Sequence, residues 1–327
     1  MNSQSTNLVG TRPSRILVCR PNGRLGNTLL VTPLIQELEA LFPGAEIDIV
    51  TACGAAFDIF RQYRSVRTIY FFPKRTWWRP VRAFLDSRRT RYDLVIDVCA
   101  VSWTGRMWAR AMRGAAKVGF VGMKHGVGLT FGLNERSAPP HMAQSPVDLV
   151  RKAFAAGLSG DARPMPLLDV KLTAAEREFG ADKLGQLIGE QGKSTPVLGV
   201  FANATGAKNL SAEFWIELVR RLRAEHPAMR VVEILPADGR ARLPNYPGYF
   251  STDVRRMAAV IGALDWFVSA DCGVMHLGVA SGAPTLGLFV ASDVAKYAPY
   301  GGRNAAIVIG SSPDQAIDEV AARLRGG

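Results

Sequence analysis

Short apolar runs alternate along the chain with longer stretches in which apolar residues recur every three or four positions. The short runs are typical of buried strands, and the longer stretches are typical of helices with one buried face. Strands are predicted at 15–20, 46–51, 68–72, 92–98, 196–202, 231–235, 266–270, 285–290 and 305–309. Helices are predicted at about 28–41, 55–63, 146–156, 174–188, 254–262, 274–282 and 313–324, with another beginning near 211. This alternation indicates an α/β protein built on parallel sheets.

Two stretches depart from the alternation. Residues 121–146 are rich in Gly, Pro, Ser and His, which predicts a loop or a lid rather than part of a sheet. Residues 74–92, KRTWWRPVRAFLDSRRTRY, mix cationic and aromatic side chains. Such a segment is either a solvated, partly helical face or a surface suited to the boundary between lipid headgroups and water.

The chain is long enough for two domains. With 327 residues and 48% hydrophobic content, it can bury a large core. The proline-bearing segment Arg163-Pro164-Met165-Pro166 precedes the helix predicted at 174–188, and the crossing between domains is expected in this region. We therefore predict one domain at 1–168, a second at 169–312 and a C-terminal helix at 313–327.

The stretch from Leu264 to Tyr300 carries the most distinctive chemistry. A buried strand ends in Asp271-Cys272-Gly273, and the period then becomes helical until Gly282. In doubly wound sheets, ligands bind where the carboxyl ends of strands meet helix amino termini, and glycine lets the backbone approach them closely. Asp271 and His276 are therefore candidate binding residues, although each alone also fits a helix cap or a core histidine.

Two other loops follow predicted strands and precede predicted helices. The first, Pro21–Asn27, contains two glycines and could bring backbone N–H groups to a phosphate or a sugar. It lacks the GxGxxG fingerprint of dinucleotide-binding proteins, which disfavours a nicotinamide enzyme. In the second loop, Asn203–Leu210, Lys208 could reach a diphosphate, although a loop lysine is also commonly just solvated.

These segments resemble a known family. The run ADCGVMHLGVASGAPTLGLF, followed by SDVAKYAPYG, is similar to the donor-site signature of glycosyltransferase family 9, which includes the ADP-heptose:lipopolysaccharide heptosyltransferases. The family has Asp-Ser/Thr-Gly-x-x-His here, so Cys272 is a departure. The resemblance covers nearly the whole chain and implies the GT-B fold, an α/β architecture of two Rossmann-like doubly wound domains facing across a cleft. It also implies that the C-terminal helix packs back on the N-terminal domain.

The resemblance implies that the second domain binds a nucleotide-diphospho-sugar. In the family, a lysine in a similar loop contacts the phosphate and sugar of the donor, which assigns that role to Lys208 and places it near the Asp271 turn. The family often has aromatic or arginine residues shortly after this lysine, where this chain has Asn209-Leu210. Glu233 or Asp238 is expected to meet the ribose. The predicted donor-binding residues are Asn203, Thr205, Lys208, Thr252, Asp271, Cys272, Gly273 and His276.

The predicted catalytic residues are Asn27 and Asp97. RPNGRLGNTLLVTPLIQEL resembles the family's opening motif, in which an aspartate is held to deprotonate the acceptor hydroxyl, but Asn27 stands at that position. An amide has no useful basicity, and a positioned general base contributes about 10²- to 10⁴-fold. Asp97, near the end of the 92–98 strand, could replace it or could simply cap the following loop. Otherwise Asn27 only orients the acceptor, or the protein is a poor catalyst.

The acceptor is expected to be anionic. The formal net charge of +12 suits an anionic membrane surface, a phosphorylated substrate or a nucleic acid. Nucleic acid would explain the charge but not the signature, so none is predicted as a partner. The predicted acceptor-binding residues lie in the first domain and are Asn22, Gly23, Arg24, Arg106 and Lys124.

The sequence predicts a cytoplasmic protein that associates peripherally with the inner membrane. The polar start, MNSQSTNLVGTRPS, lacks the apolar core of a signal peptide, and no apolar run reaches the length of a membrane span. The cysteines form no CxxC pair and the histidines no ligand spacing, so neither a metal site nor a disulfide framework is expected. No cofactor is predicted beyond the ADP-sugar co-substrate.

Together these observations predict an inverting, metal-independent transfer of heptose from ADP-heptose to a lipopolysaccharide core or a related anionic glycolipid. One alternative is another nucleotide-sugar transferase or an epimerase on the same scaffold. The other alternative, suggested by Asn27, is a catalytically weak protein that binds sugar nucleotides.

Overall fold

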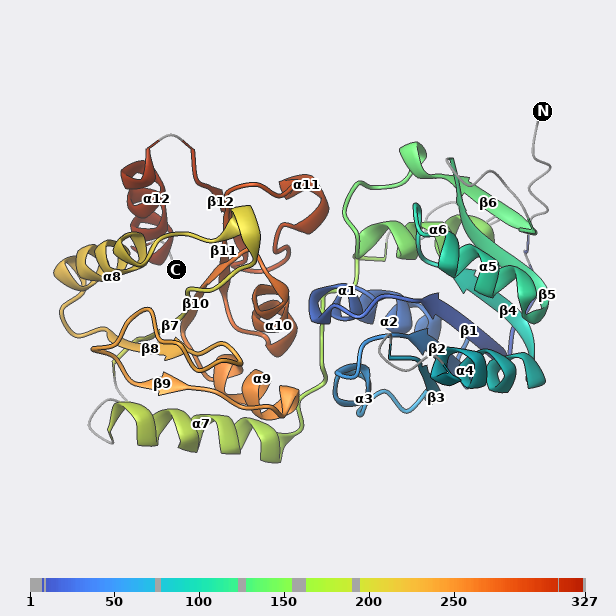
Figure 1. Ribbon diagram of the computed structural model, residues 1–327, viewed down its shortest axis with the longest axis horizontal. Coiled ribbons are helices and arrows are strands. Elements are labelled where there is room, and N and C mark those ends of the chain that lie inside the picture. The colour runs from blue at the N-terminus through green and yellow to red at the C-terminus, as the bar shows by residue number, and fades with distance from the viewer. Residues whose placement is uncertain are drawn as a thin grey trace. The chain divides into compact units, whose positions relative to one another are not determined.

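The computed structural model describes residues 8, 10–73, 78–122, 128–154, 163–189, 195–310 and 312–325. The chain divides into two compact units, Met1–Leu168 and Asp169–Gly327. Each unit contains a six-stranded parallel sheet, blue to green in the first unit and yellow to red in the second (Figure 1). No helix in the described ranges is both long enough and apolar enough to cross a membrane.

The first sheet has the strand order β3-β2-β1-β4-β5-β6, so the chain reverses direction across the sheet between β1 and β4. Its strands are β1 (Arg15–Arg20), β2 (Glu46–Thr51), β3 (Val66–Phe71), β4 (Arg91–Asp97), β5 (Arg113–Val121) and β6 (Phe131–Asn134). The register places Cys19 of β1 opposite Asp97 of β4. Such a reversal point leaves a crevice at the carboxyl edge of a doubly wound sheet.

Helices of the first unit follow most of its strands. They are α1 (Leu25–Leu29), α2 (Thr32–Leu41), α3 (Ala56–Ile59), α4 (Trp78–Arg89), α5 (Trp103–Ala111) and α6 (Gln144–Phe154), with a 3-10 turn η1 (Glu135–Ser137). The single helix predicted at about 28–41 is two helices, the first of which begins earlier, at Leu25; Pro33 in the first turn of α2 favours a new helix start. On the face of the sheet that carries Leu17 and Val95, α4 and α5 form one core cluster around Trp108.

The prediction of a loop throughout 121–146 is wrong. Residues 131–134 form β6, which pairs in parallel with β5 at the edge of the sheet. Both strands contain glycine and are largely half-exposed, so neither shows the buried apolar run that predicted the other strands. The pairing depends on a neighbouring strand rather than on local pattern, and β5 was not predicted either.

The second sheet has the order β12-β11-β10-β7-β8-β9. Its strands are β7 (Val197–Phe201), β8 (Arg230–Ile234), β9 (Gly248–Tyr249), β10 (Trp266–Ala270), β11 (Thr285–Phe289) and β12 (Ala305–Val308). Its helices are α7 (Ala174–Ile188), α8 (Ala212–Glu225), α9 (Val254–Gly262), α10 (Gly273–Ser281), α11 (Val294–Tyr297) and α12 (Pro313–Arg325), with a 3-10 turn η3 (Gly206–Lys208). Strands β7, β10 and β11 are fully buried, as their apolar runs predict.

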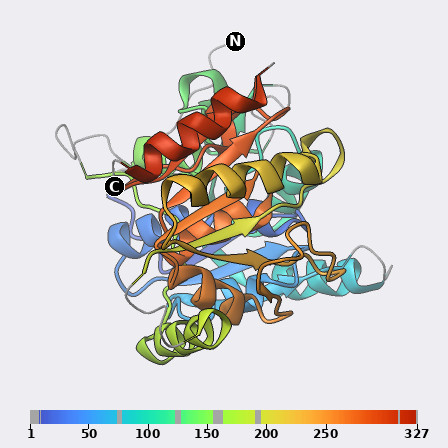
Figure 2. The same cartoon turned by 90° about the vertical axis from the view of Figure 1, so that its left-hand side faces the viewer.

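The C-terminal helix belongs to the core of the second unit. In Figure 2, α12 (red) lies beside α8 (yellow), and buried residues of both helices join one cluster. Arg221 of α8 also forms ion pairs with Asp314 and Asp318 of α12. The prediction that this helix packs on the N-terminal domain stays a prediction; within its own unit, the buried face of α12 covers the apolar surface of β10 to β12.

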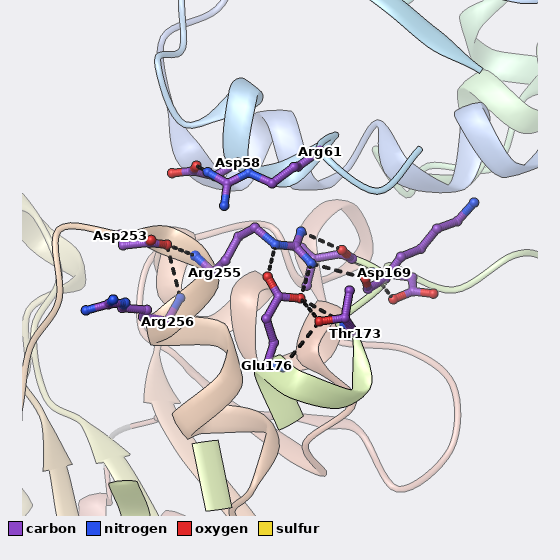
Figure 3. A network of polar contacts seen from close by, with 10 residues as sticks. Asp58, Arg61, Asp169, Thr173, Glu176, Asp253, Arg255 and Arg256 are labelled. Atoms are coloured by element: carbon purple, nitrogen blue, oxygen red, sulfur yellow. Dashed lines mark hydrogen bonds and ion pairs between the residues drawn. The ribbon is translucent and has the colours of Figure 1, made fainter. Parts of the chain in front are cut away.

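A buried arginine fixes the first residues of the second unit (Figure 3). Arg255 of α9 is 2% exposed, forms an ion pair with Glu176 of α7, and donates to the carbonyl oxygens of Val170 and Lys171. Glu176 also completes a capping box with Thr173 at the start of α7. The segment that enters the second unit is thereby held against α7 and α9.

This ion pair predicts an acid-sensitive contribution to stability. The hydrogen bond from Arg255 is the main cause that lowers the pKa of Glu176 from 4.5 to about 2. The folded pKa lies below the unfolded one, so the contribution, about 3 kcal/mol, is present above about pH 4.5 and is lost as the pH falls towards 2. Urea unfolding of Glu176→Gln should show a smaller loss of stability with acid than the wild type. Glu178→Gln, an exposed change on the same helix, is the control and should retain the wild-type dependence; equal pH profiles for all three proteins would contradict the prediction.

Candidate functional site

Three neighbouring loops at the carboxyl edge of the second sheet converge on Lys208. Lys208 lies in the loop after β7, and its Nζ is 2.9 Å from Oδ2 of Asp271, which follows β10. The same Nζ lies 5.9 Å from the ring centroid of Tyr297 in α11, which follows β11. Because β7, β10 and β11 are adjacent and parallel, their carboxyl ends share one edge, and this places the three side chains together.

The Lys208–Asp271 contact is an ion pair without a hydrogen bond. Its length of 2.9 Å lies within hydrogen-bond distance, but Oδ2 of Asp271 is buried and has no hydrogen-bond partner in the described part of the chain. The Lys208 side chain keeps 35% of its surface exposed, whereas Asp271 keeps 4%. The lysine balances the charge of Asp271 but leaves the hydrogen-bonding capacity of Oδ2 unused, so the pair can exchange this contact for others when a ligand supplies an anion and hydroxyl groups.

Helix α10 begins directly after Asp271. Cys272 is its N-cap and Gly273 its first residue, so the first-turn amides, which have no partner within the helix, face the edge where Lys208 lies. Burial raises the pKa of Cys272, and the amides of Val274 and Met275 offset only part of that shift, so the thiol is neutral at physiological pH. His276 lies on the same helix and is buried.

A pocket of about 670 Å³ opens on the other side of the Lys208 loop, between the segments that follow β7 and β8. Asn203, Asp238 and Arg242 are among its lining residues. Arg242 donates to Oδ1 of Asn203 at 3.5 Å, and the buried Nδ2 of Asn203 has no partner among the described residues. The volume is typical of small-molecule sites.

The other residues predicted to bind the donor differ in how exposed they are. Thr205 is exposed in the loop after β7, and Thr252 is exposed just before α9. Glu233 is fully buried and accepts hydrogen bonds from the amides of Arg242 and Leu243. Glu233 therefore holds the loop after β8 in place, which leaves Asp238 as the acidic residue that lines the pocket.

In the first unit, the side chain of Asn22 stabilises a tight turn in the loop after β1. Oδ1 of Asn22 accepts a hydrogen bond from the amide of Arg24, a local turn that asparagine favours. Gly23 approaches the neighbouring loop so closely that a Cβ would lie 3.2 Å from the carbonyl oxygen of Ala52. Asn27 is half-buried in α1, three residues from the exposed Arg24.

Asp97 and Arg106 form a buried ion pair. Nε of Arg106 donates to Oδ2 of Asp97 at 2.9 Å, and the two side chains are 1% and 0% exposed. Oδ1 of Asp97 accepts from the amide of Cys99, and Arg106 also donates to the carbonyl oxygen of Phe120. A carboxylate held this way is not placed to take a proton from a substrate, so the geometry favours loop capping over the base predicted for Asp97. The acceptor-binding role predicted for Arg106 likewise finds no support in this placement.

Two predictions remain open. Lys124 lies outside the described residues, so its predicted role in acceptor binding has no structural counterpart here. Within the described ranges, no three His, Cys, Asp or Glu side chains gather as a metal site, and metal independence stays a prediction. Tyr297 was not predicted as a site residue, although it lies within the segment SDVAKYAPYG that follows the signature.

Comparisons with known proteins agree with this architecture. The family model described as "Glycosyltransferase family 9 (heptosyltransferase)" matches residues 82–322. No curated protein sequence matches the chain. A family 9 glycosyltransferase from Veillonella parvula has a TM-score of 0.73 at 17% identity, over 99% of this chain and 91% of that one.

Two E. coli structures are also similar. ADP-heptose lipopolysaccharide heptosyltransferase II has a TM-score of 0.70 at 18% identity, with 95% of this chain and 99% of that chain covered. The heptosyltransferase WaaC with ADP has a TM-score of 0.71 at 18% identity, with 94% and 99% covered. These likenesses and the two parallel sheets confirm the predicted GT-B fold class. Because the family model matches residues 82–322, most of the chain, this chain belongs to glycosyltransferase family 9, the heptosyltransferase family.

Proposed function

We propose that the protein transfers heptose, with inversion, from ADP-heptose to the core of a lipopolysaccharide or to a related anionic glycolipid. The observation that supports this most directly is the convergence of Lys208, Asp271 and the start of α10 at one sheet edge. Both E. coli relatives are named as heptosyltransferases, and one of them holds ADP. The reaction needs a site that binds a diphosphate and stabilises it as it leaves.

We place each part of the donor against a different part of this edge. The diphosphate would lie against Lys208 and the first-turn amides of α10, where positive charge and helix dipole meet the charge that develops on the leaving group. Asp271, released from Lys208, would accept hydrogen bonds from sugar hydroxyls. The nucleoside would occupy the neighbouring pocket, where Asp238 can reach ribose hydroxyls and Asn203 has a free amide donor.

Transfer assays with ADP-heptose and truncated lipopolysaccharide acceptors test this function, with mass spectrometry as the readout. We expect a mass increase of one heptose on the acceptor, and the same rate in the presence of EDTA. Parallel assays with UDP- and GDP-sugars address the rival transferases. No product with ADP-heptose, together with turnover or epimerisation of another sugar nucleotide, would reject the proposal.

Asn27 in α1 is proposed to orient the acceptor hydroxyl, because its amide can bond to a hydroxyl group but cannot take its proton. Asn27→Asp is therefore expected to raise kcat by about tenfold, part of the full contribution of a positioned base. The pH profile of kcat should also gain an acidic limb. A variant that creates activity where the wild type has none would instead identify the natural protein as a sugar-nucleotide-binding protein.

An exposed apolar surface on the first unit supports the proposal of a lipid-linked acceptor. Trp78, Val81 and Leu85 of α4 are each about half exposed, and their spacing places them on one side of the helix. The neighbouring α5 exposes Trp103 and Met107. The two helices contact each other through the rings of Phe84 and Trp108, 5.4 Å apart, and through a hydrogen bond from Trp108 to Ser87.

Cationic side chains accompany this apolar surface. Exposed arginines on the two helices are Arg79, Arg82, Arg88, Arg89 and Arg110. Apolar side chains that enter the headgroup region and arginines that attract anionic lipids are the combination by which peripheral proteins bind bilayers. We expect α4 and α5 to rest on an anionic membrane surface, close to where glycolipid acceptors lie.

Vesicle binding tests this surface. Trp78→Ser combined with Leu85→Ser is expected to weaken binding to phosphatidylglycerol-containing vesicles by about tenfold or more, because each side chain loses apolar burial. Raised salt should weaken the wild type as well. Val308→Ser, at an equally exposed apolar residue of the second unit, is the control and should leave binding unchanged. Equal vesicle binding by the wild type and all variants would contradict the proposal that α4 and α5 bind the membrane.

A further inference from the structure

Arg20 occupies the reversal point of the first sheet. It is the last residue of β1, whose neighbours are β2 on one side and β4 on the other. The loops after β1 and β4 start in opposite directions from this point, and ligands of doubly wound sheets bind in the crevice between such loops. The side chain belongs to the same carboxyl edge as the turn at Asn22 and the helix that carries Asn27.

The guanidinium of Arg20 is buried, and the described residues supply no counter-charge for it. Arg20 is 7% exposed, and Nη1 contacts Sγ of Cys99 at 3.5 Å. Its Nε is buried with no hydrogen-bond partner, and no carboxylate in the described part of the chain forms an ion pair with it. A thiol sulfur is only a weak acceptor, so it satisfies little of a planar group with five N–H donors.

The other buried arginines of the chain show what a structural role requires. Arg106 is 1% exposed and pairs with Asp97, and Arg255 is 2% exposed and pairs with Glu176. Both also donate to backbone carbonyl oxygens. Arg20 has neither kind of partner in the segments that the structure describes, although Asp97 lies opposite its neighbour Cys19 in the sheet register and is already bound to Arg106. A buried charge left unpaired costs stability, and such residues persist where a ligand completes the pair.

We propose that Arg20 binds an anionic group of the acceptor, a carboxylate or a phosphate, at the reversal point of the first sheet. The planar fork of the guanidinium matches the two oxygens of either group. The bound anion would supply the counter-charge that the described residues lack, at the same sheet edge as the helix of Asn27, the residue proposed to orient the acceptor hydroxyl. The assignment to an acceptor rests on the proposed transferase function, whereas the anion site itself rests on the geometry of Arg20.

Thermal unfolding with inorganic phosphate tests the anion site without any activity assay. Phosphate is expected to raise the Tm of the wild type. The increase should be smaller in Arg20→Met and Arg20→Gln, and in Arg20→Lys it should be close to that of the wild type. Phosphate can also bind at Lys208, so Lys208→Ala should keep the Arg20-dependent part of the shift. Arg91→Met is the control: it removes an exposed arginine at the amino-terminal end of β4, at the opposite edge of the sheet from Arg20. Phosphate should raise its Tm as much as that of the wild type.

Stability of the phosphate-free proteins gives a second readout. Arg20→Met removes an unpaired buried charge, so its Tm should equal or exceed that of the wild type, whereas Arg106→Met should lower the Tm by leaving Asp97 unpaired. If Arg20→Met instead lowers the Tm as much as Arg106→Met does, or if phosphate shifts the Tm of Arg20→Met as much as that of the wild type, the site is overturned.

Kinetics then connect the site to the acceptor. In the transfer assay, Arg20→Met should raise KM for the acceptor by tenfold or more and leave KM for ADP-heptose unchanged. An unchanged acceptor KM would overturn the link to the acceptor. An Arg20-dependent phosphate shift in a protein that transfers no heptose would reject the proposed function and leave the anion site standing.

Discussion

Replacing Lys208 by alanine is expected to lower kcat/KM for ADP-heptose by about 10²- to 10³-fold. Losses of that size follow removal of one donor that stabilises a developing negative charge in a closed site. Lys208 is the cation that the structure places beside both Asp271 and the start of α10. Steady-state kinetics with the donor as the varied substrate measure the effect.

Lys296→Ala provides the matched control. Lys296 lies on α11 next to Tyr297, is half exposed, and pairs with Asp293 on the same helix. Its loss should change kcat/KM by less than about twofold, since exposed pairs of this kind contribute little. Retention of full donor affinity and turnover in Lys208→Ala would place the diphosphate elsewhere.

Asp97→Asn is expected to destabilise the protein by about 3–5 kcal/mol, the usual result of breaking a buried ion pair by removing one partner. The asparagine can still cap the amide of Cys99, but the guanidinium of Arg106 is left without its counter-charge. Urea unfolding measures the change in the free energy of unfolding. Any loss of turnover should follow the fraction of unfolded protein.

Asp86→Asn is the control for this change. Asp86 forms pairs with Arg82 and Arg89 on the exposed side of α4, where an ion pair contributes about 0–1 kcal/mol. If Asp97→Asn keeps wild-type stability and still loses turnover, Asp97 is the base after all, and the structural role assigned to it here is wrong.

Local pattern was sufficient for the fully buried strands. The predicted strands at 15–20 and 266–270 coincide with β1 and β10, because both run through the centre of a sheet and contain a run of buried, mostly apolar residues. The predicted helices at 174–188 and 254–262 also coincide with α7 and α9. The half-exposed strands β5 and β6, the last two at one side of the first sheet, were not predicted, because their pairing follows from neighbouring strands rather than from local pattern.

The candidate donor edge could be anticipated because parallel strands bring their carboxyl ends to one side. That rule places the loop of Lys208 beside the turn of Asp271 without knowledge of any side-chain contact. The rule does not say which charges are buried or what pairs with them. In sequence, Asp97 looks like any carboxylate at a strand end, and only the packed structure shows that it pairs with Arg106 and that no described carboxylate pairs with Arg20.

A crystal structure of the protein with ADP would test the central claim most directly. It should place the diphosphate within hydrogen-bond distance of Nζ of Lys208 and of the first-turn amides of α10, with the nucleoside in the pocket beside Asn203. ADP bound away from this edge, with the Lys208–Asp271 contact intact, would contradict it.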